Sequence, residues 1–195
     1  WTATTLKSEK YNIHLSKVKS IRSFISFLNF KIGIFFERFA ANRAHKVFAA
    51  SLTTQKNLIS DLRLNKANIE VMNPIIDVEK YSYKPIASRD NETYVLFMGI
   101  FSKRKNIDLL LRSFVMVKKK KSDIKLKLVG KLNGFGEFYE DLIKSLGLEN
   151  SVEIIGEVEN NVKYFQNALC TVSTSHEEGF GMVLAESLSC GTPVV

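Results

Sequence analysis

Two glutamates, Glu178 and Glu186, flank the start of a predicted helix near the end of this 195-residue chain. The stretch HEEGFGMVLAESLSCGTPVV places a glycine-bounded loop, 179–181, between a predicted strand over 170–173 and a predicted helix over 182–189. Free backbone N–H groups at such a helix start bind phosphate, and glycines let the backbone approach a ligand closely. A carboxylate about one turn into the helix could accept two hydrogen bonds from a ribose diol. These features outline a site for a nucleotide-sugar.

The run EGFGMVLAE, followed by GTPVV, resembles the donor-site signature of the family-4 retaining glycosyltransferases, which have the GT-B fold. The match is specific, because it combines two spaced acids with a Gly-x-Pro stop rather than a lone glycine pattern. The alternative is an ordinary helix with solvated glutamates. The resemblance implies a catalytic role for Glu178 in orienting the donor sugar, and ribose binding by Glu186. It also implies that the backbone at the helix start contacts the donor, at Gly179, Phe180, Gly181, Met182 and Val183.

The tract GIFSKRKN, which follows another predicted strand, resembles the first βα unit of the C-terminal GT-B lobe. In that lobe a Gly-Arg…Lys pattern grips the donor diphosphate, and the resemblance places Gly99 and Lys105 at the glycine and the lysine. Ile100 stands where the family has arginine, so Arg104 or Lys103 is expected to supply the missing phosphate contact. Without the C-terminal signature, this basic run would be interpreted as a solvated turn.

The rest of the chain alternates short apolar stretches with helical patterns, which predicts a parallel, doubly wound α/β sheet. In such sheets ligands bind beyond the carboxyl ends of the strands. Gly99, Gly130, Gly156 and the loop 173–181 all fall at that edge, so we expect them to line one crevice. The resemblance places 157–158 near the nucleotide base. Strands are predicted over 46–50, 70–72, 93–98, 126–130, 152–155 and 194–195, and helices over 54–61, 107–119, 137–146 and 161–167.

The resemblance divides the chain into parts of two Rossmann-like lobes, both incomplete. Residues 1–88 are expected to form the C-terminal part of the N-terminal, acceptor lobe plus the interlobe linker, which the polar stretch 85–92 would supply. Residues 89–195 are expected to form most of the donor lobe. A GT-B enzyme needs about twice this length, on the usual 100–200 residues per domain. The chain has no initiator methionine and stops inside a predicted strand, so we expect a fragment that is inactive alone.

A separate pattern over 19–38 predicts an amphipathic helix with a wide apolar side. Charges interrupt every window of about 18–20 residues, so this helix is not predicted to span a membrane. Apolar helix faces usually pack into a core, and packing against the sheet of the acceptor lobe is the expectation. The alternative is docking to a bilayer surface beside a lipid-linked acceptor. The predicted location is cytoplasmic, with possible peripheral contact at the inner face of the membrane.

The composition, 45% hydrophobic and 25% charged, permits a packed core. The net charge of +8 favours polyanions, but aromatic and basic residues are not interleaved as base stacking would require, so nucleic acid is not expected. Cys170 and Cys190 lie in apolar sequence and are expected to be buried, reduced thiols. No Cys/His metal spacing and no Asp-x-Asp motif occur, so no metal or other cofactor is expected. His176 is expected to be a loop residue without a functional role rather than a contact to the sugar donor.

Together these patterns predict a retaining glycosyltransferase that moves a hexose from a UDP- or GDP-sugar to a hydroxyl of a glycan or lipid-linked acceptor. The product would be a cell-surface polysaccharide or glycolipid. Cations and a helix dipole would stabilise the departing diphosphate. Two alternatives stay open. One is another GT-B nucleotide-sugar enzyme, such as a sugar-phosphate synthase, and the other is a non-catalytic membrane-surface adaptor.

Overall fold

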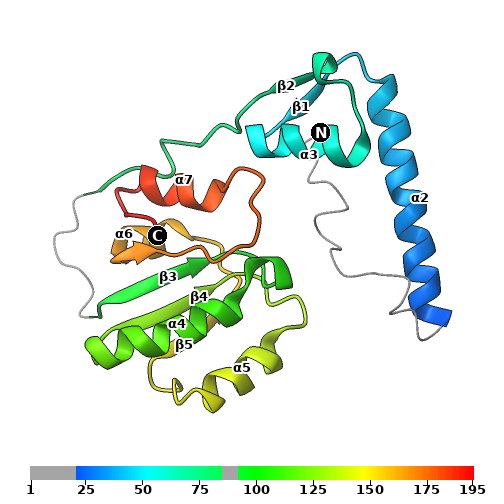
Figure 1. The fold of residues 1–195 in the computed structure, drawn as a ribbon. Helices are drawn as coiled ribbons and strands as arrows, with labels where there is room; N and C mark the ends of the chain where they lie inside the picture. The colour runs from blue at the N-terminus through cyan, green and yellow to red at the C-terminus, as the bar shows by residue number, and fades with distance from the viewer. Residues whose placement is uncertain (1–20, 85–91) are drawn as a thin grey trace. The chain divides into compact units, whose positions relative to one another are not determined.

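The computed structural model describes residues 21–84 and 92–195, which fall into two compact units divided after Ile75 (Figure 1). Residues 76–84 precede the predicted linker and belong to the second unit. Most of that linker, and the first two residues of the predicted helix over 19–38, lie outside the described residues.

The first unit combines two short parallel strands with helices. From residue 21 on, its elements are α2 (Ile21–Arg43), β1 (Val47–Ala49), α3 (Leu52–Leu62), a 3-10 turn (Lys66–Asn68) and β2 (Ile69–Val71). The two strands pair with Val47 opposite Ile69. The apolar core between strands and α3 is formed by Ala49, Leu58, Leu62, Leu64 and Ile69.

Helices α2 and α3, as described, are both longer than the sequence pattern predicts. Helix α3 begins two residues before the predicted start, because Ser51 caps it: the Ser51 hydroxyl accepts a hydrogen bond from Thr54 N at 3.1 Å. Helix α2 continues past the predicted end at residue 38 to Arg43. The added residues include two alanines, the best helix formers, so the helix persists after the apolar pattern has ended.

The second unit is built on a four-stranded parallel sheet in the order β5-β4-β3-β6. Beyond β6, a parallel bridge pairs Thr171 with Val194. This alternation of strand and helix confirms the predicted parallel α/β sheet. The strands are β3 (Tyr94–Met98), β4 (Lys125–Val129), β5 (Val152–Gly156) and β6 (Cys170–Thr171), and the helices are α4 (Ile107–Lys120), α5 (Gly136–Ser145), α6 (Val162–Asn167) and α7 (Met182–Ser189).

Helices cover both faces of this sheet, and each face has its own apolar core (Figure 1). Helices α4 and α5 pack on one face, and α6 and α7 pack on the other. All residues of β3 are buried, as expected for a central strand covered on both sides. Phe97 belongs to the first core with Leu111 and Tyr139, whereas Leu96 belongs to the second core with Phe165.

The loops at the carboxyl edge of the sheet hold more structure than the sequence pattern indicates. Strand β6 is shorter than predicted, but Val172 N still donates to Leu96 O at 2.8 Å and continues the extended chain. The basic tract forms a 3-10 turn, Lys103–Lys105. Asn106 then adopts a left-handed conformation, with φ of 49°, immediately before α4. Asparagine tolerates this conformation better than most residues.

Candidate functional site

The order of the strands reverses at β3. The chain runs outward from β3 through β4 to β5, and then crosses back to place β6 on the other side of β3. Ligands of open parallel sheets bind where the order reverses, beyond the carboxyl ends of the strands. Thr174 Oγ1 donates to the carbonyls of Lys105 and Asn106, at 3.1 and 3.0 Å. His176 N donates to Arg104 O at 2.9 Å. These bonds fasten the loop after β6 to the loop after β3.

Three glycines predicted to share this edge lie next to one another. A Cβ atom at Gly130 would lie 2.1 Å from the carbonyl oxygen of Gly99, so only glycine fits there. Gly130 N also donates to Gly156 O at 2.7 Å. A Cβ at Gly99 would lie 3.5 Å from Cε of Lys105. The close backbone approach therefore positions the loop that carries Lys105.

Glu178 is the centre of a polar cluster ahead of α7. Its Oε1 atom accepts hydrogen bonds from Lys105 Nζ at 2.5 Å and from Ser175 Oγ at 2.7 Å. Arg104 Nη1 lies 3.4 Å from Oε2 of the same carboxylate and donates to the Glu177 carbonyl at 2.8 Å. The side chains of Lys105 and Glu178 are 13% and 26% exposed, so the pair is shielded yet reachable. The cluster holds two cations beside Glu178, in the loop that precedes α7.

The surroundings of Glu178 favour its ionised form. Burial alone would raise the pKa of this carboxyl. Hydrogen bonds from Lys105 and Ser175, with the charges of Lys105 and Arg104, outweigh burial and hold the pKa below its ordinary value of 4.5. Because an ionised carboxylate is purely an acceptor, Glu178 can take hydrogen bonds from hydroxyl groups.

Glu186, within α7, has the opposite surroundings. Burial raises the pKa of its carboxyl above 4.5, and a hydrogen bond from Tyr81 and the charge of Lys80 offset this only in part. The Tyr81 side chain is buried, and its hydroxyl accepts a hydrogen bond from Asn161 Nδ2 at 3.1 Å. Neither Tyr81 nor Asn161 is among the residues predicted for the site. Their positions are 80 residues apart, so no local pattern could have connected them.

The start of α7 has no side-chain cap. Gly181 is the N-cap residue, with φ of +84°, a conformation that glycine adopts at little cost. The first bonds of the helix run to Gly181 O from Leu184 N at 2.9 Å and Ala185 N at 3.1 Å. The N–H groups of Met182 and Val183 precede these bonds and have no hydrogen-bond partner among residues 21–84 and 92–195, which makes them donors of the kind that bind anions at helix starts.

The predicted site residues share one edge of the sheet but separate into two groups. Lys105 and Arg104 contact Glu178, whereas the pKa of the Glu186 carboxyl responds to Tyr81 and Lys80. Ile100, which stands in the place of the family arginine, is 56% exposed. Lys103 and Arg104 were the two candidates to replace that arginine, and Arg104 is the one that reaches Glu178. Ser175, which the sequence analysis missed, stands three positions before Glu178, the spacing of a local side-chain bond.

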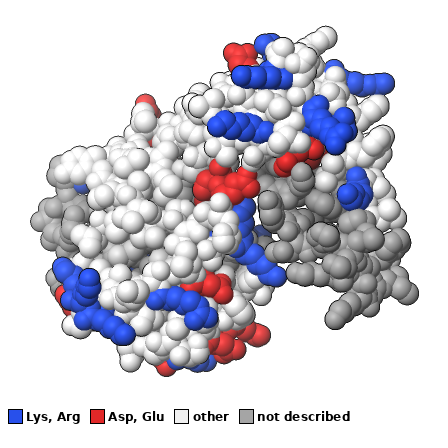
Figure 2. Space-filling view, viewed as in Figure 1, with Lys and Arg blue, Asp and Glu red and all other residues white. Residues whose placement is uncertain are grey.

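The remaining predictions concern thiols, metals and charge. Cys190 is buried and Cys170 half-buried, both are free, and burial raises the pKa of each thiol. Over residues 21–84 and 92–195, no three His, Cys, Asp or Glu side chains gather closely enough to hold a metal ion. Within the same ranges, no helix is both long and apolar enough to cross a bilayer. Figure 2 shows acidic and basic side chains interspersed on the described part of one face.

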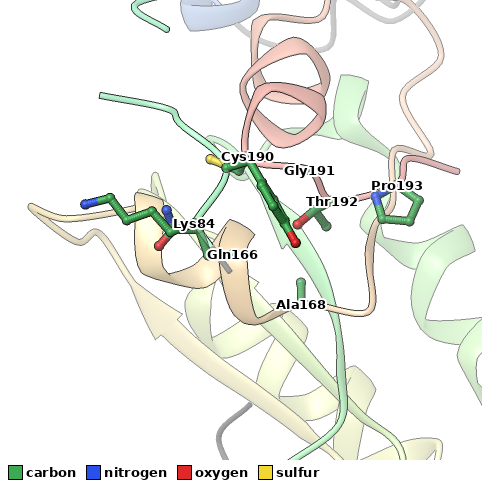
Figure 3. Close-up of a pocket in the computed structure, with 8 residues that line it drawn as sticks. Lys84, Gln166, Ala168, Cys190, Gly191, Thr192 and Pro193 are labelled. Carbon is green, nitrogen blue, oxygen red and sulfur yellow. The ribbon is translucent and has the colours of Figure 1, made fainter. Parts of the chain in front are cut away.

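A cavity of about 180 Å³ lies elsewhere on the second unit (Figure 3). It sits between the end of α7 and the start of β6, at the amino edge of the sheet, and contains none of the predicted site residues. Gly191 is packed against the Tyr83 ring there, since an added Cβ would lie 2.4 Å from Cδ2 of that ring. The lining residues are Tyr83, Lys84, Gln166, Ala168, Cys190, Gly191, Thr192 and Pro193.

Comparisons with known proteins agree with this geometry. The family model described as glycosyl transferases group 1 matches residues 80–195, more than half of the chain. The N-acetylgalactosamine-N,N'-diacetylbacillosaminyl-diphospho-undecaprenol 4-alpha-N-acetylgalactosaminyltransferase of Campylobacter jejuni is 30% identical over 159 residues, covering 78% of this chain and 41% of that protein. The capsular polysaccharide biosynthesis glycosyltransferase CapM of Staphylococcus aureus is 25% identical over 188 residues, covering 94% of this chain and 49% of that protein.

A solved structure supports the fold. The crystal structure of HepE from Anabaena in complex with UDP and glucose superposes with a TM-score of 0.72 at 24% identity, over 83% of this chain and 47% of that one. Together with the parallel α/β sheet, this likeness confirms the predicted GT-B fold class. The chain spans half or less of the length of the two curated relatives described above.

Proposed function

The chain belongs to the glycosyl transferases group 1, and we propose that it supplies the donor site of an enzyme that transfers a hexose from a UDP- or GDP-sugar to a hydroxyl of a glycan or lipid-linked acceptor. The observation that carries the proposal is the cluster of Lys105, Arg104 and Glu178 at the start of α7. It stands at the reversal of strand order, where ligands of such sheets bind. Relatives named as transferases for an undecaprenol-linked saccharide and for capsular polysaccharide support the acceptor class.

The diphosphate of the donor is expected to lie between Lys105 and the first N–H groups of α7. Fixed cations and a helix start stabilise the negative charge that grows on the leaving diphosphate, and they do so without reorganising. Arg104 adds a second cation from the same turn, where the family arginine is replaced by Ile100. Because Lys105 and Arg104 supply positive charge at the diphosphate, we expect transfer to need no metal ion.

Glu178 is proposed to orient the donor sugar together with the backbone of Gly179, Phe180 and Gly181. Its ionised carboxylate is suited to accept hydrogen bonds from sugar hydroxyls, and Lys105 and Ser175 fix its orientation. Glu186 is proposed to bind the ribose hydroxyls. Retention of configuration is expected from the family resemblance.

Transfer assays on the full-length protein test this function. UDP- and GDP-hexoses are supplied with a hydroxyl-bearing saccharide or lipid-linked saccharide, and the released nucleotide is measured. We expect release from one donor class, its loss in Lys105→Ala, and its persistence in Lys103→Ala, which removes an exposed lysine from the same turn. Equal loss in both variants, or no release with any donor, would contradict the proposal.

Contact with the inner face of the membrane is a second proposal, carried by the exposed phenylalanines of α2. Phe35, Phe36 and Phe39 are 64%, 61% and 46% exposed. The Arg43 guanidinium lies 4.2 Å from the centre of the Phe39 ring, which puts a cation beside this apolar surface. Helices that combine apolar and basic side chains bind anionic bilayers.

The test of membrane contact is sedimentation with anionic vesicles. We expect the full-length protein to sediment with the vesicles, and we expect this binding to be lost when Phe35 and Phe36 are changed to Ser. Unchanged sedimentation of that variant would overturn it.

A further inference from the structure

We propose that Thr174 is a positioning residue that holds Lys105 in place for the diphosphate of the donor. The inference rests on the proposed function, because it concerns the cation assigned to that diphosphate. The signature of the donor site begins four positions later, at Glu178, and does not include Thr174. Thr174 acts on the donor only through the backbone of the turn that carries Lys105.

The turn that carries Lys105 is closed by backbone bonds from Lys105 N to Ser102 O at 3.1 Å and from Asn106 N to Lys103 O at 3.2 Å. In the described part of the chain, neither the Ser102 nor the Asn106 side chain caps the turn or helix α4. Asn106 is left-handed, with φ of 49°, and such backbone persists only where the surrounding structure enforces it. A contact from outside the turn is therefore expected to hold it.

The loop after β6 supplies this contact at three consecutive carbonyls. Thr174 Oγ1 lies 3.1 Å from Lys105 O and 3.0 Å from Asn106 O, and its single proton serves both carbonyls. His176 N donates to Arg104 O at 2.9 Å. The bond from His176 belongs to the backbone, so any residue except proline could make it. The bond from Thr174 depends on the side-chain hydroxyl.

The sheet fixes the position of Thr174. Val172 N donates to Leu96 O at 2.8 Å, and Ser173 N donates to Val195 O at 2.9 Å. Thr174 follows directly on these two bonds, and it is half-buried. Because the sheet places its hydroxyl, Thr174 can set the position of the turn instead of following the turn when it moves.

The cationic side chains of the turn reach back to the same loop. Lys105 Nζ lies 2.5 Å from Glu178 Oε1, and Arg104 Nη1 donates to Glu177 O at 2.8 Å. The backbone of the turn and its two cations are thus both held by the loop after β6. Without the Thr174 hydroxyl, two carbonyls of the turn lose a donor, and a shift of the turn carries the Lys105 ammonium with it. Misplacement of a positioning group by about 1 Å is enough to weaken a site.

The test is Thr174→Val in the full-length protein, which removes the hydroxyl and keeps a side chain of the same shape. Isothermal titration with UDP and with GDP measures the nucleotide affinity. We expect Thr174→Val to weaken binding of the preferred nucleotide about three- to tenfold, and Thr174→Ser, which restores the hydroxyl, to stay within about twofold of the wild type. In a Lys105→Ala background, Thr174→Val should cause no further loss, because it acts through Lys105.

Thr192→Val is the matched control. The Thr192 hydroxyl also donates to a backbone carbonyl, that of Phe165 at 2.5 Å, and its side chain is buried. It lies at the amino edge of the sheet, away from the turn of Lys105. We expect Thr192→Val to lower the melting temperature but to change the nucleotide affinity less than about twofold. An equal loss of affinity in Thr174→Val and Thr192→Val, or an equal effect of Thr174→Val with and without Lys105, would overturn the inference.

A carboxyl NMR titration of the ligand-free protein separates this inference from the proposed function. Burial raises the pKa of Glu178, and Lys105 lowers it by a hydrogen bond and by its charge. Thr174→Val should therefore raise the pKa of Glu178, and Thr192→Val should leave it unchanged. If the wild type binds a nucleotide but neither this pKa nor the affinity changes in Thr174→Val, the inference fails and the proposed function stands. If neither nucleotide binds the wild type, the proposed function fails, and the diphosphate role of Thr174 fails with it.

Discussion

Glu178 and Glu186 are the same residue type at the two ends of one short stretch, yet the fold gives them opposite surroundings. Glu178 is held by two cations and a serine hydroxyl, and the pKa of its carboxyl is lowered despite burial. At Glu186, burial raises the pKa of the carboxyl, and Tyr81 and Lys80 offset this only in part. Paired carboxyl groups whose pKa values are pushed apart commonly divide the work of a site. Here the division fits a cation-rich region around Glu178 for the diphosphate and sugar, and a less charged region around Glu186 for the nucleoside.

Removing the lysine that defines the cation-rich region should have the largest effect. Lys105→Ala deletes the shortest bond to Glu178 and the proposed diphosphate contact. We expect kcat/KM to fall about 100- to 1000-fold, as when one fixed transition-state donor is lost. Steady-state kinetics of the full-length enzyme measure this, with Lys103→Ala as the control. A decrease of less than about tenfold would mean that Lys105 does not contact the departing group.

Exchanging each glutamate for glutamine should separate their roles. Glu186→Gln is expected to weaken UDP or GDP binding about tenfold, which is about 1.4 kcal/mol, because an amide cannot accept from both ribose hydroxyls. Glu178→Gln is expected to lower kcat more than it weakens nucleotide binding, since the released Lys105 stays available to the diphosphate. Binding titrations and kinetics on both variants check this. Identical profiles would mean that the two carboxylates do not divide the site.

The same exchange should give opposite pH dependences of stability. Glu178 has a lowered pKa, so it stabilises the fold above pH 4.5 and loses that effect as the pH falls through its folded-state pKa. Glu178→Gln should therefore reduce the free energy of unfolding by about 1 kcal/mol at pH 7, and by less in acid. Glu186 has a raised pKa, so its favourable contribution is present below pH 4.5 and is lost as the pH rises.

Glu186→Gln should consequently be as stable as the wild type at pH 7, or more stable, with the difference fading in acid. Denaturant unfolding at several pH values measures both variants. Parallel pH curves for the two variants would contradict the difference in their surroundings.

The smallest effect is expected from Ser175→Ala, which removes one neutral donor from the Glu178 carboxylate. A loss of about threefold in kcat/KM corresponds to a net hydrogen-bond contribution near 0.6 kcal/mol. Ser113→Ala, on the exposed face of α4, serves as the control in the same assay. If Ser175→Ala equals Lys105→Ala in effect, the serine has a larger part in the chemistry than the cluster suggests.

The two glutamates also mark how far the sequence could predict this molecule. The strand–loop–helix pattern placed Glu178 beside the loop of Lys105, because the carboxyl ends of parallel strands meet at one edge. The surroundings of Glu186 could not be found this way. Tyr81 lies near α7 because the segment ahead of β3 packs across α6 and α7, and packing between distant segments leaves no local pattern.

The prediction of backbone details was limited in a similar way. The sequence predicted the strands of the second unit to within a few residues, from buried apolar runs. It missed the left-handed Asn106 and the end of α2 at Arg43, because neither depends on apolar periodicity. Such turns and helix ends are decided by local backbone energies that are small beside the burial of the core.

The most direct test of the account is a calorimetric titration of the full-length protein with UDP and GDP, comparing the wild type with Lys105→Ala, Glu186→Gln and Lys103→Ala. We expect that one nucleotide binds the wild type, that Lys105→Ala and Glu186→Gln each weaken this binding about tenfold or more, and that Lys103→Ala changes it less than about twofold. Absence of binding at millimolar nucleotide, or a nucleotide affinity that is unchanged in both Lys105→Ala and Glu186→Gln, would contradict the assignment of this edge of the sheet as the donor site.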